Sequence, residues 1–284
     1  MNLHWLLIIV YCFLSTTACG QTPHSVSITT QPTSTNLRTG KQTFTLHSIP
    51  TDIIYPGDST FIGTMLVLPG WNFPRQDWCE KSSLCTEALR RGYCLVMPEM
   101  GKSIYPTRYY PQSRKDWVKY PTLAWLTDTL IDTLQKRYKL FQPNQRNVVV
   151  GLSTGARGTL LVLMRKPNLW KAGGALSGDY IPEKIPTDNL LTGIYGNFQQ
   201  NRNLWLGDEH PYPNVSRLKT PLYLGHGKKD AVVPFNQSDL FYQKLKKDLP
   251  DLKIIFHADA HAGHDYRYWN SEVLPMLRFF EEVK

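Results

Sequence analysis

The chain has 284 residues, of which 42% are hydrophobic and 19% are charged. This is the length and composition of one sizeable globular domain, which excludes wholesale disorder and a polytopic membrane protein. The formal net charge of +9 favours acidic surfaces, but Lys and Arg occur in short pairs such as 90–91 and 246–247 rather than in a long run. Nucleic-acid-binding proteins concentrate their basic residues, so we expect a solvated basic surface and no nucleic-acid partner.

The N-terminal segment carries an apolar run over residues 6–14, far shorter than the roughly 20 residues needed to span a bilayer. It predicts the hydrophobic region of a signal peptide, and the small residues that follow suit a cleavage site. The stretch ending at Cys19 resembles the lipobox of bacterial lipoproteins, whose cysteine is acylated. We expect a signal peptide over 1–19 and export, either as a periplasmic or membrane-anchored lipoprotein through Cys19 or as a secreted protein.

Residues 20–41 are rich in Thr, Ser, Pro and Gln and predict a flexible leader before a catalytic domain over 42–284. Three cysteines fall in that domain, and an odd count leaves one thiol outside any internal disulfide. Cys79 and Cys85 are close enough to pair across a short turn in an oxidising compartment, and the sequence leaves this pairing open. Cys94 lies in an apolar strand, where we expect an inert core thiol.

The alternation of polar and apolar residues over 43–49 predicts a half-buried antiparallel strand. Beyond it, short apolar runs alternate with longer amphipathic segments, which predicts an α/β fold with a mostly parallel sheet and helices on both faces. Strands are expected at 64–68, 93–97, 147–151, 172–176, 222–225 and 253–257, and helices at 80–91, 122–138, 156–165, 236–247 and 271–282. Residues 177–220 break this rhythm and predict a cap-like excursion over the mouth of an active site.

The strongest signal is the motif Gly151-Leu152-Ser153-Thr154-Gly155, which joins an apolar run to a helix-forming segment. At such a turn the serine backbone is strained, the flanking glycines permit the strain, and the hydroxyl projects above the sheet. The amide of Thr154 and the helix N-terminus then face the oxyanion that forms when the serine attacks an acyl carbon. Ser153 could instead simply cap the helix, but the strand before it and the helix after it favour a nucleophile.

Two further motifs supply an acid and a base. Residues 226–234 read HGKKDAVVP and contain Asp230; they resemble the H-G-x-x-D-x-x-V-P signature of esterases and prolyl-oligopeptidase-like enzymes. His264 lies in GHDYRYW, over 263–269, which resembles the ending of bacterial esterase-D-like proteins. The order Ser, Asp, His is that of the α/β-hydrolase superfamily, which the chain resembles from about residue 43 to its end.

This resemblance implies an α/β-hydrolase fold and a serine hydrolase that uses no metal or organic cofactor. Ser153 is expected as nucleophile, His264 as general base, and Asp230 as the acid that orients the imidazole. Residues 69–72 stand where many lipases and esterases have H-G-G-G, so the amide of Trp71 is expected as the second oxyanion donor, with Asn72 as the alternative. Side chains expected to line the substrate pocket are Asn72, Tyr105, Tyr180 and Trp205.

Other assignments compete for these roles. Asp179 follows the strand before the excursion, where a minority of related enzymes carry the acid, but Asp230 is the better candidate. His226 precedes the acid at a strand end and is expected to brace the loop rather than act as the base. A metal cluster could be drawn from His257, Asp259, His261 and Asp265, but they lack a helical H-x-x-x-H pair and a second ligand group.

Three functions remain in view. The first is an exported carboxylic-ester hydrolase acting on a small-molecule or glycan ester. The second is a serine peptidase of the prolyl-oligopeptidase type; a propeller or large N-terminal domain usually accompanies those enzymes, and the sequence predicts none here. The third is a non-catalytic lipoprotein with a hydrolase fold, which is disfavoured because every position of the triad carries a competent residue. Substrate identity and oligomeric state do not follow from the sequence.

Overall fold

The computed structural model describes residues 40–57, 60–117 and 120–283. The predicted signal peptide over 1–19, including Cys19, and all but the last two residues of the leader lie outside the described residues. Within them, no helix is long and apolar enough to cross a membrane.

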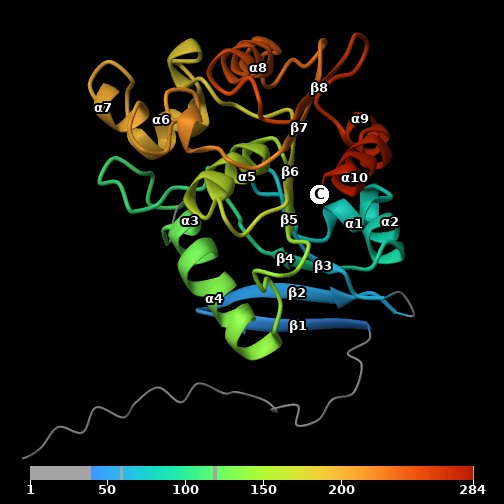
Figure 1. Cartoon of the computed structure of the whole chain (residues 1–284). Helices are drawn as coiled ribbons and strands as arrows, with labels where there is room; N and C mark the ends of the chain where they lie inside the picture. Colours follow the sequence, from blue (N-terminus) through green and yellow to red (C-terminus); the bar gives the residue numbers. More distant parts are fainter. Residues whose placement is uncertain (1–39, 58–59, 118–119, 284) are drawn as a thin grey trace, which may run out of the picture. The chain divides into compact units, whose positions relative to one another are not determined.

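Eight strands in the described part of the chain form one sheet in the order β1-β2-β4-β3-β5-β6-β7-β8 (Figure 1). Their bounds are Gly40–Leu46 (β1), Ile49–Tyr55 (β2), Gly63–Leu68 (β3), Tyr93–Pro98 (β4), Val148–Leu152 (β5), Ala172–Leu176 (β6), Leu222–Gly227 (β7) and Ile254–Asp259 (β8). β2 is antiparallel to both β1 and β4, whereas every other pair is parallel. The carboxyl ends of β5, β7 and β8 therefore meet at one edge of the sheet.

The first strand differs from its prediction. β1 begins at Gly40, two residues before the expected domain start, and ends at Leu46. A two-residue turn follows, in which both His47 and Ser48 have positive φ angles of 51° and 65°, as in the type I′ turns whose twist matches a β-hairpin. The predicted strand over 43–49 runs through this turn and misses β2, because neither turn residue is the Gly or Asn that normally marks such a bend.

Helices cover both faces of the sheet, as predicted (Figure 1). One face packs against α1 (Asp77–Lys81), α2 (Leu84–Arg90), α9 (Tyr266–Ser271) and α10 (Val273–Glu282), and the other against α3 (Thr122–Ala124), α4 (Ile131–Thr133), α5 (Thr154–Arg165) and α8 (Asn236–Asp248). α3 and α4 belong to one continuous helix over 122–138 whose remaining turns are π-helical. The strands between the two layers are buried on both faces, which explains their unbroken apolar sequence.

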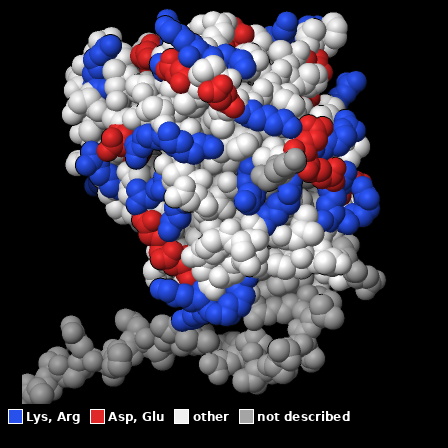
Figure 2. Space-filling view, viewed as in Figure 1, with Lys and Arg blue, Asp and Glu red and all other residues white. Residues whose placement is uncertain are grey.

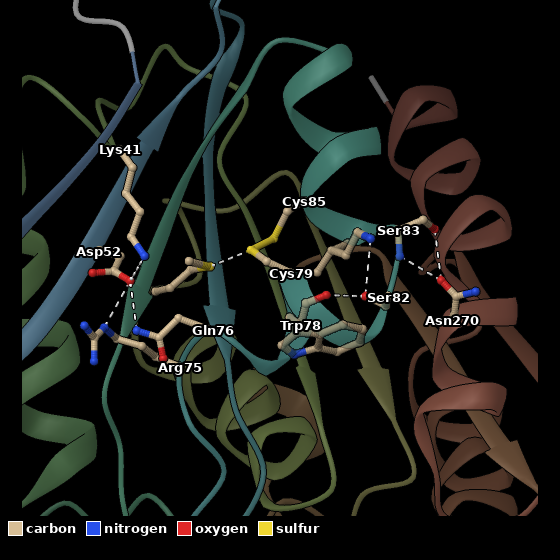
Figure 3. The surroundings of a disulfide bond; sticks show 12 residues. Lys41, Asp52, Arg75, Gln76, Trp78, Cys79, Ser82, Ser83, Cys85 and Asn270 are labelled. Atoms are coloured by element: carbon tan, nitrogen blue, oxygen red, sulfur yellow. Dashed lines mark hydrogen bonds and ion pairs between the residues drawn. A yellow bond between two sulfur atoms is a disulfide. The ribbon is translucent and has the colours of Figure 1, made fainter.

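A disulfide joins Cys79 of α1 to Cys85 of α2, with the two Cα atoms 5.0 Å apart (Figure 3). It bridges a break in the helix predicted over 80–91, since the chain turns at Ser83 before α2 begins. The amide and hydroxyl of Ser83 both donate to Oδ1 of Asn270, at 2.8 and 3.0 Å, and so tie this corner to α9. The pairing left open by the sequence is therefore present, and Cys94 is buried in β4.

The excursion, residues 177–221, connects β6 to β7 and contains α6 (Asn189–Tyr195) and α7 (Arg202–Trp205). The apolar side chains of its middle part form a cluster of their own with the segment before α3, whereas those near its two ends join the main core. The buried members are Ile104, Tyr110, Leu191, Ile194, Tyr195, Phe198 and Trp205. This separate cluster gives the excursion a packed interior away from the two faces of the sheet.

Candidate active site

The turn between β5 and α5 forces Ser153 into a conformation that L-residues rarely adopt, with φ at 53° and ψ at −125°. Its amide donates to the carbonyl of Leu176 at 2.8 Å, which anchors the turn to β6. A Cβ atom at Gly151 would lie 2.1 Å from the carbonyl oxygen of Gly155, and one at Gly155 would lie 2.5 Å from that of Pro69. Both glycines of the motif are therefore required by close backbone contacts.

The structure brings Ser153, His264 and Asp230 together in one chain of hydrogen bonds. His264 Nε2 lies 3.0 Å from Ser153 Oγ, and His264 Nδ1 lies 2.7 Å from Asp230 Oδ2. A carboxylate only accepts hydrogen bonds, so Nδ1 carries the proton, and Nε2 is left to accept from the serine hydroxyl. The Asp230 side chain is fully buried and that of His264 is 9% exposed. The three residues meet where the ends of β5, β7 and β8 converge.

Asp230 is held as a carboxylate by its surroundings. Burial raises its pKa, but hydrogen bonds from His226 and His264 outweigh that effect and hold the pKa well below its usual range. The amides of Val232 and Val233 also donate to its other oxygen, at 2.9 and 2.8 Å. A charged acid is what an imidazole needs if it is to take up a proton during a reaction.

His226 also approaches Asp230, with Nε2 at 3.2 Å from Oδ2, but its ring is fixed on both sides. Nε2 lies 3.0 Å from the carbonyl oxygen of Val233, so it carries the proton, and Nδ1 accepts from Ser238 Oγ at 2.6 Å. Since both nitrogens are engaged away from Ser153, His226 braces the acid loop, as predicted, and is not the base.

Trp269 supports the other side of the His264 ring. The indole meets the imidazole edge-on, with ring centroids 5.0 Å apart, and its Nε1 donates to Ser177 Oγ at 3.1 Å. Trp269 is 1% exposed, so it also excludes water from behind the imidazole. The tryptophan in the C-terminal motif thus has a physical role, which is to fix the plane of the histidine.

Two backbone amides were expected to face the oxyanion: that of Thr154, which follows Ser153, and that of Trp71, in the loop whose Pro69 carbonyl lies close to Gly155. No described residue accepts a hydrogen bond from the amide of Trp71 or of Thr154, whereas the amide of Asn72 donates to the carbonyl of Gly101 at 2.9 Å. The alternative assignment of Asn72 as the oxyanion donor is therefore wrong, because that amide is already used.

The loop that carries Trp71 is held from below. The hydroxyl of Tyr105 donates to the carbonyl of Pro69 at 2.8 Å, and Trp78 Nε1 donates to that of Leu68 at 3.2 Å. Tyr105 is fully buried. It was expected to line the pocket, but it lies beneath the loop and contributes to its position instead.

A pocket of about 350 Å³ opens beside Ser153 and Thr154, within the size range of small-molecule sites. Its other lining residues are Ile104, Asp179, Val232–Pro234 and the stretch 184–191 of the excursion. Among the remaining expected pocket residues, Tyr180 is fully buried against Phe241, with ring centroids 4.8 Å apart. Trp205 is buried in the cluster of the excursion, and Asn72 is exposed on the oxyanion loop without lining this pocket. None of the four residues expected to line a pocket lines this one: the three aromatic side chains are packed in the interior, and Asn72 is exposed elsewhere.

The structure also bears on two competing assignments, which are Asp179 as the acid and the residues around His257 as metal ligands. Asp179 pairs with Arg157 Nη1 at 3.2 Å and does not contact His264, so it is not the acid. His257 Nδ1 lies 2.7 Å from Glu272 Oε1, while Asp259 accepts from the amide of His261. Asp265 caps α9. No group of three or more potential metal ligands is found in the described ranges.

Lys and Arg side chains on the face shown in Figure 2 form several separate groups with Asp and Glu between them. This face carries no single basic stripe of the kind that follows a nucleic-acid backbone.

The sequence matches the family model of the prolyl oligopeptidase family over residues 88–284. The chain belongs to that family. The match begins in α2 and includes the segments of Ser153, Asp230 and His264. A search of curated protein sequences gave no significant match.

Solved structures of this family's fold resemble the chain at low sequence identity. FphF, a fluorophosphonate-binding serine hydrolase of Staphylococcus aureus, is 16% identical with a TM-score of 0.67; the match covers 84% of this chain and 97% of that one. An S-formylglutathione hydrolase from Agrobacterium tumefaciens is 14% identical with a TM-score of 0.69, covering 89% and 99%. An acylaminoacyl peptidase is 16% identical with a TM-score of 0.64, covering 86% of this chain but 41% of that one. The predicted α/β-hydrolase fold is thereby confirmed.

Proposed function

We propose that this protein is an exported serine hydrolase that cleaves carboxylic esters, with Ser153 as nucleophile, His264 as general base and Asp230 as the orienting acid. One observation carries the proposal: His264 bridges Ser153 and Asp230 at 3.0 and 2.7 Å. We assign the amides of Trp71 and Thr154 as the two oxyanion donors, and this is supported by the absence of any acceptor for either amide among the described residues.

In the first half of the proposed reaction, Ser153 Oγ attacks the carbonyl carbon and His264 Nε2 takes the hydroxyl proton. The negative charge that develops on the carbonyl oxygen is stabilised by the amides of Trp71 and Thr154. The imidazolium next to Asp230 then protonates the leaving alkoxide, the C–O bond breaks, and an alcohol departs from an acyl-enzyme.

In the second half, a water molecule takes the place of the alcohol. His264 Nε2 removes one of its protons as the oxygen attacks the acyl carbon, and the same proton returns to Ser153 Oγ when the acyl bond breaks. The products are a carboxylic acid and the regenerated serine. Asp230 keeps the imidazole in one tautomer throughout and stays ionised.

Ester hydrolysis is favoured over peptide hydrolysis by the structural relatives. The matches that span nearly the whole of the other chain include an S-formylglutathione hydrolase at 99% and a ferulic acid esterase at 97%, whereas the acylaminoacyl peptidase is matched over 41% of its length. Family membership keeps a serine peptidase as the second candidate function.

A fluorophosphonate probe tests the proposed nucleophile. We expect wild-type protein to be labelled and Ser153→Ala to be unlabelled and inactive, with a loss in kcat of about 10⁶ by analogy with subtilisin. Wild-type protein that resists the probe while correctly folded would support the non-catalytic alternative. A panel of p-nitrophenyl esters and aminoacyl-proline anilides then separates the two enzymatic candidates, since a peptidase would cleave the anilides with the higher kcat/KM.

The proposal of export rests on the leader sequence and is supported by the disulfide between Cys79 and Cys85, because disulfides persist in oxidising compartments. Fractionation of cells that express the full chain tests it. We expect the protein in the membrane fraction, and Cys19→Ser in the soluble exported fraction. Recovery of the wild-type protein from the cytoplasm with free thiols at residues 79 and 85 would contradict export.

A further inference from the structure

Asp179 is a buried carboxylate on the floor of the pocket that Ser153 lines. It is the third residue after β6 and is only 8% exposed. Its Oδ2 lies 3.2 Å from Nη1 of Arg157, and its own backbone amide also donates to the carboxylate. No other side chain among the described residues is seen to donate to Oδ1. Asp179 has no part in the proton transfer from Ser153 to His264, so the site holds a charged group that the proposed mechanism does not use.

Arg157 balances the charge of Asp179 and keeps it in place. It lies on the first turn of α5, is fully buried, and donates through Nη2 to the backbone carbonyl of Glu209 at 2.5 Å. The carboxylate of Glu209 has other donors, since Tyr195 donates to it at 2.6 Å and Thr107 donates through both its amide and its hydroxyl. The pair of Arg157 and Asp179 is therefore close to neutral as a unit, and the guanidinium fixes one carboxylate oxygen.

The rest of the pocket is a mixture of apolar wall and polar mouth. Ile104 and Leu191 are buried at the wall, while Lys184, Thr187 and Asn189 are exposed at the mouth. Asp188 also lines the pocket, but its side chain accepts from the amide of Leu191 as the N-cap of α6, and Lys184 offsets its charge. Because the formal charges around the pocket cancel, it favours a neutral group that donates hydrogen bonds over a cation.

We propose that Asp179 selects esters whose portion in this pocket carries a hydroxyl group, which donates a hydrogen bond to Asp179 Oδ1. The substrate class is thus a hydroxylated ester, either on the acyl side or on a sugar-like alcohol. This inference rests on the proposed ester hydrolysis and names its substrate.

The environment of Asp179 favours a hydrogen bond from a substrate hydroxyl group. Burial raises the pKa of Asp179 to about 6, although Arg157 acts to lower it. A carboxylate can accept about four hydrogen bonds, and Arg157 is the one side chain among the described residues that donates to Asp179, so the carboxylate can accept a further donor from the pocket. A substrate hydroxyl supplies one donor, and an alkyl group of the same size displaces water without replacing its hydrogen bond.

Matched pairs of esters test the proposal. For the acyl side, the pair is p-nitrophenyl β-hydroxybutyrate and p-nitrophenyl butyrate; for the alcohol side, it is acetylated xylose and cyclohexyl acetate. Hydrogen bonds to charged groups contribute about 1.5–3 kcal/mol, so we expect wild-type protein to prefer the hydroxylated member of at least one pair by roughly tenfold or more in kcat/KM. The same ratio is then measured in Asp179→Asn, which keeps the shape and a partner for Arg157, and in the double variant Arg157→Met/Asp179→Leu, which leaves no buried charge unpaired.

We expect the preference to shrink in Asp179→Asn and to fall to about one in the double variant, while Asp251→Asn, an exposed carboxylate in the turn before β8, keeps the wild-type ratio. A wild-type ratio near one in both pairs, or a ratio that the variants leave unchanged, overturns the proposal. The proposal is also overturned if p-nitrophenyl β-aminobutyrate is preferred over both the β-hydroxybutyrate and the butyrate, and if this preference depends on Asp179. The pocket would then select a cationic group rather than a hydroxyl group. Failure of fluorophosphonate labelling rejects the proposed function itself, whereas Ser153-dependent labelling with unchanged ratios rejects only the role of Asp179.

Discussion

The edge of the sheet and the excursion hold their functional groups in different ways. At the edge, backbone geometry places Ser153, through a left-handed turn and two glycines that permit contacts too close for any side chain. In the excursion, buried polar side chains hold the structure in place instead. Glu209, for example, accepts hydrogen bonds from both Tyr195 and Thr107. Backbone contacts constrain the reacting atoms whatever the neighbouring side chains are, whereas a side-chain network can be rebuilt by substitution.

The network in the excursion includes a histidine that is kept neutral. Burial lowers the pKa of His210 to about 4, even though Glu183 acts in the opposite direction. His210 is 1% exposed, and its Nε2 lies 2.6 Å from Glu183 Oε2. Since Nε2 faces a carboxylate, it carries the single proton of the neutral ring. His210 itself therefore stays neutral through the neutral pH range.

The largest expected effect comes from the sheet edge. Asp230→Asn should reduce kcat by about 10⁴, because the amide favours the wrong tautomer of His264. A matched control is Asp259→Asn, since Asp259 is the last residue of β8 and also accepts from two backbone amides, at 2.7 and 3.0 Å, but has no hydrogen bond to His264. Steady-state kinetics with p-nitrophenyl butyrate measure both variants. Activity in Asp230→Asn within tenfold of the wild type would show that this carboxylate is not the acid.

A smaller effect is expected in the excursion. Glu209→Gln replaces a buried carboxylate by an amide whose NH₂ group meets donors, so we expect the free energy of unfolding to fall by about 3 kcal/mol. Denaturant unfolding measures the change, and Glu282→Gln, at a carboxylate that is 61% exposed, serves as the control. We also expect Ser153 to keep its reactivity toward the fluorophosphonate. If Glu209→Gln reduced fluorophosphonate labelling as strongly as it reduced ester selectivity, the sheet edge and the excursion would not be structurally independent.

The smallest predicted effect is a dependence of selectivity on pH. With a pKa of about 6, Asp179 is ionised above pH 6 and protonated below it, so the hydroxyl preference should be full at pH 8 and fall several-fold by pH 5. The charged groups that face Asp179 are Arg157 of α5 and, at the pocket mouth, Lys184 and Asp188. The measurement is the ratio of kcat/KM for the two members of one ester pair at each pH, since proton transfers common to both esters cancel. A ratio that is constant from pH 5 to pH 8 would exclude Asp179 as the hydrogen-bond acceptor.

The parts of the site that sequence predicts are those encoded by local constraints. The turn at Ser153 could be predicted because its motif is contiguous, although only Gly151 is required by a contact within a few residues and Gly155 is required by the distant Pro69. The parallel strands could be predicted because burial on both faces leaves an unbroken apolar run. The hairpin at His47 was missed because its turn residues are not those that usually adopt positive φ angles.

Pocket residues could not be predicted, because they depend on packing between distant segments. From the sequence, Tyr105 was expected to line the pocket. In the structure it lies between the Pro69 carbonyl and α5, so close to α5 that a Cβ atom at Gly158 would be 2.7 Å from its ring. Asp179 drew notice only as a rival acid. In the structure it lines the pocket and pairs with Arg157 of α5, a contact between distant segments that no local pattern reveals.

The backbone of Ser153 has a consequence for how this protein can be improved. A non-glycine residue held at a positive φ angle of 53° costs of order 1–3 kcal/mol, and glycine would relieve that cost. Laboratory evolution for heat resistance alone would thus reward Ser153→Gly, which abolishes the nucleophile. Screens for robust variants of this protein must score turnover and thermal tolerance together, because at this one position the two demands select opposite residues.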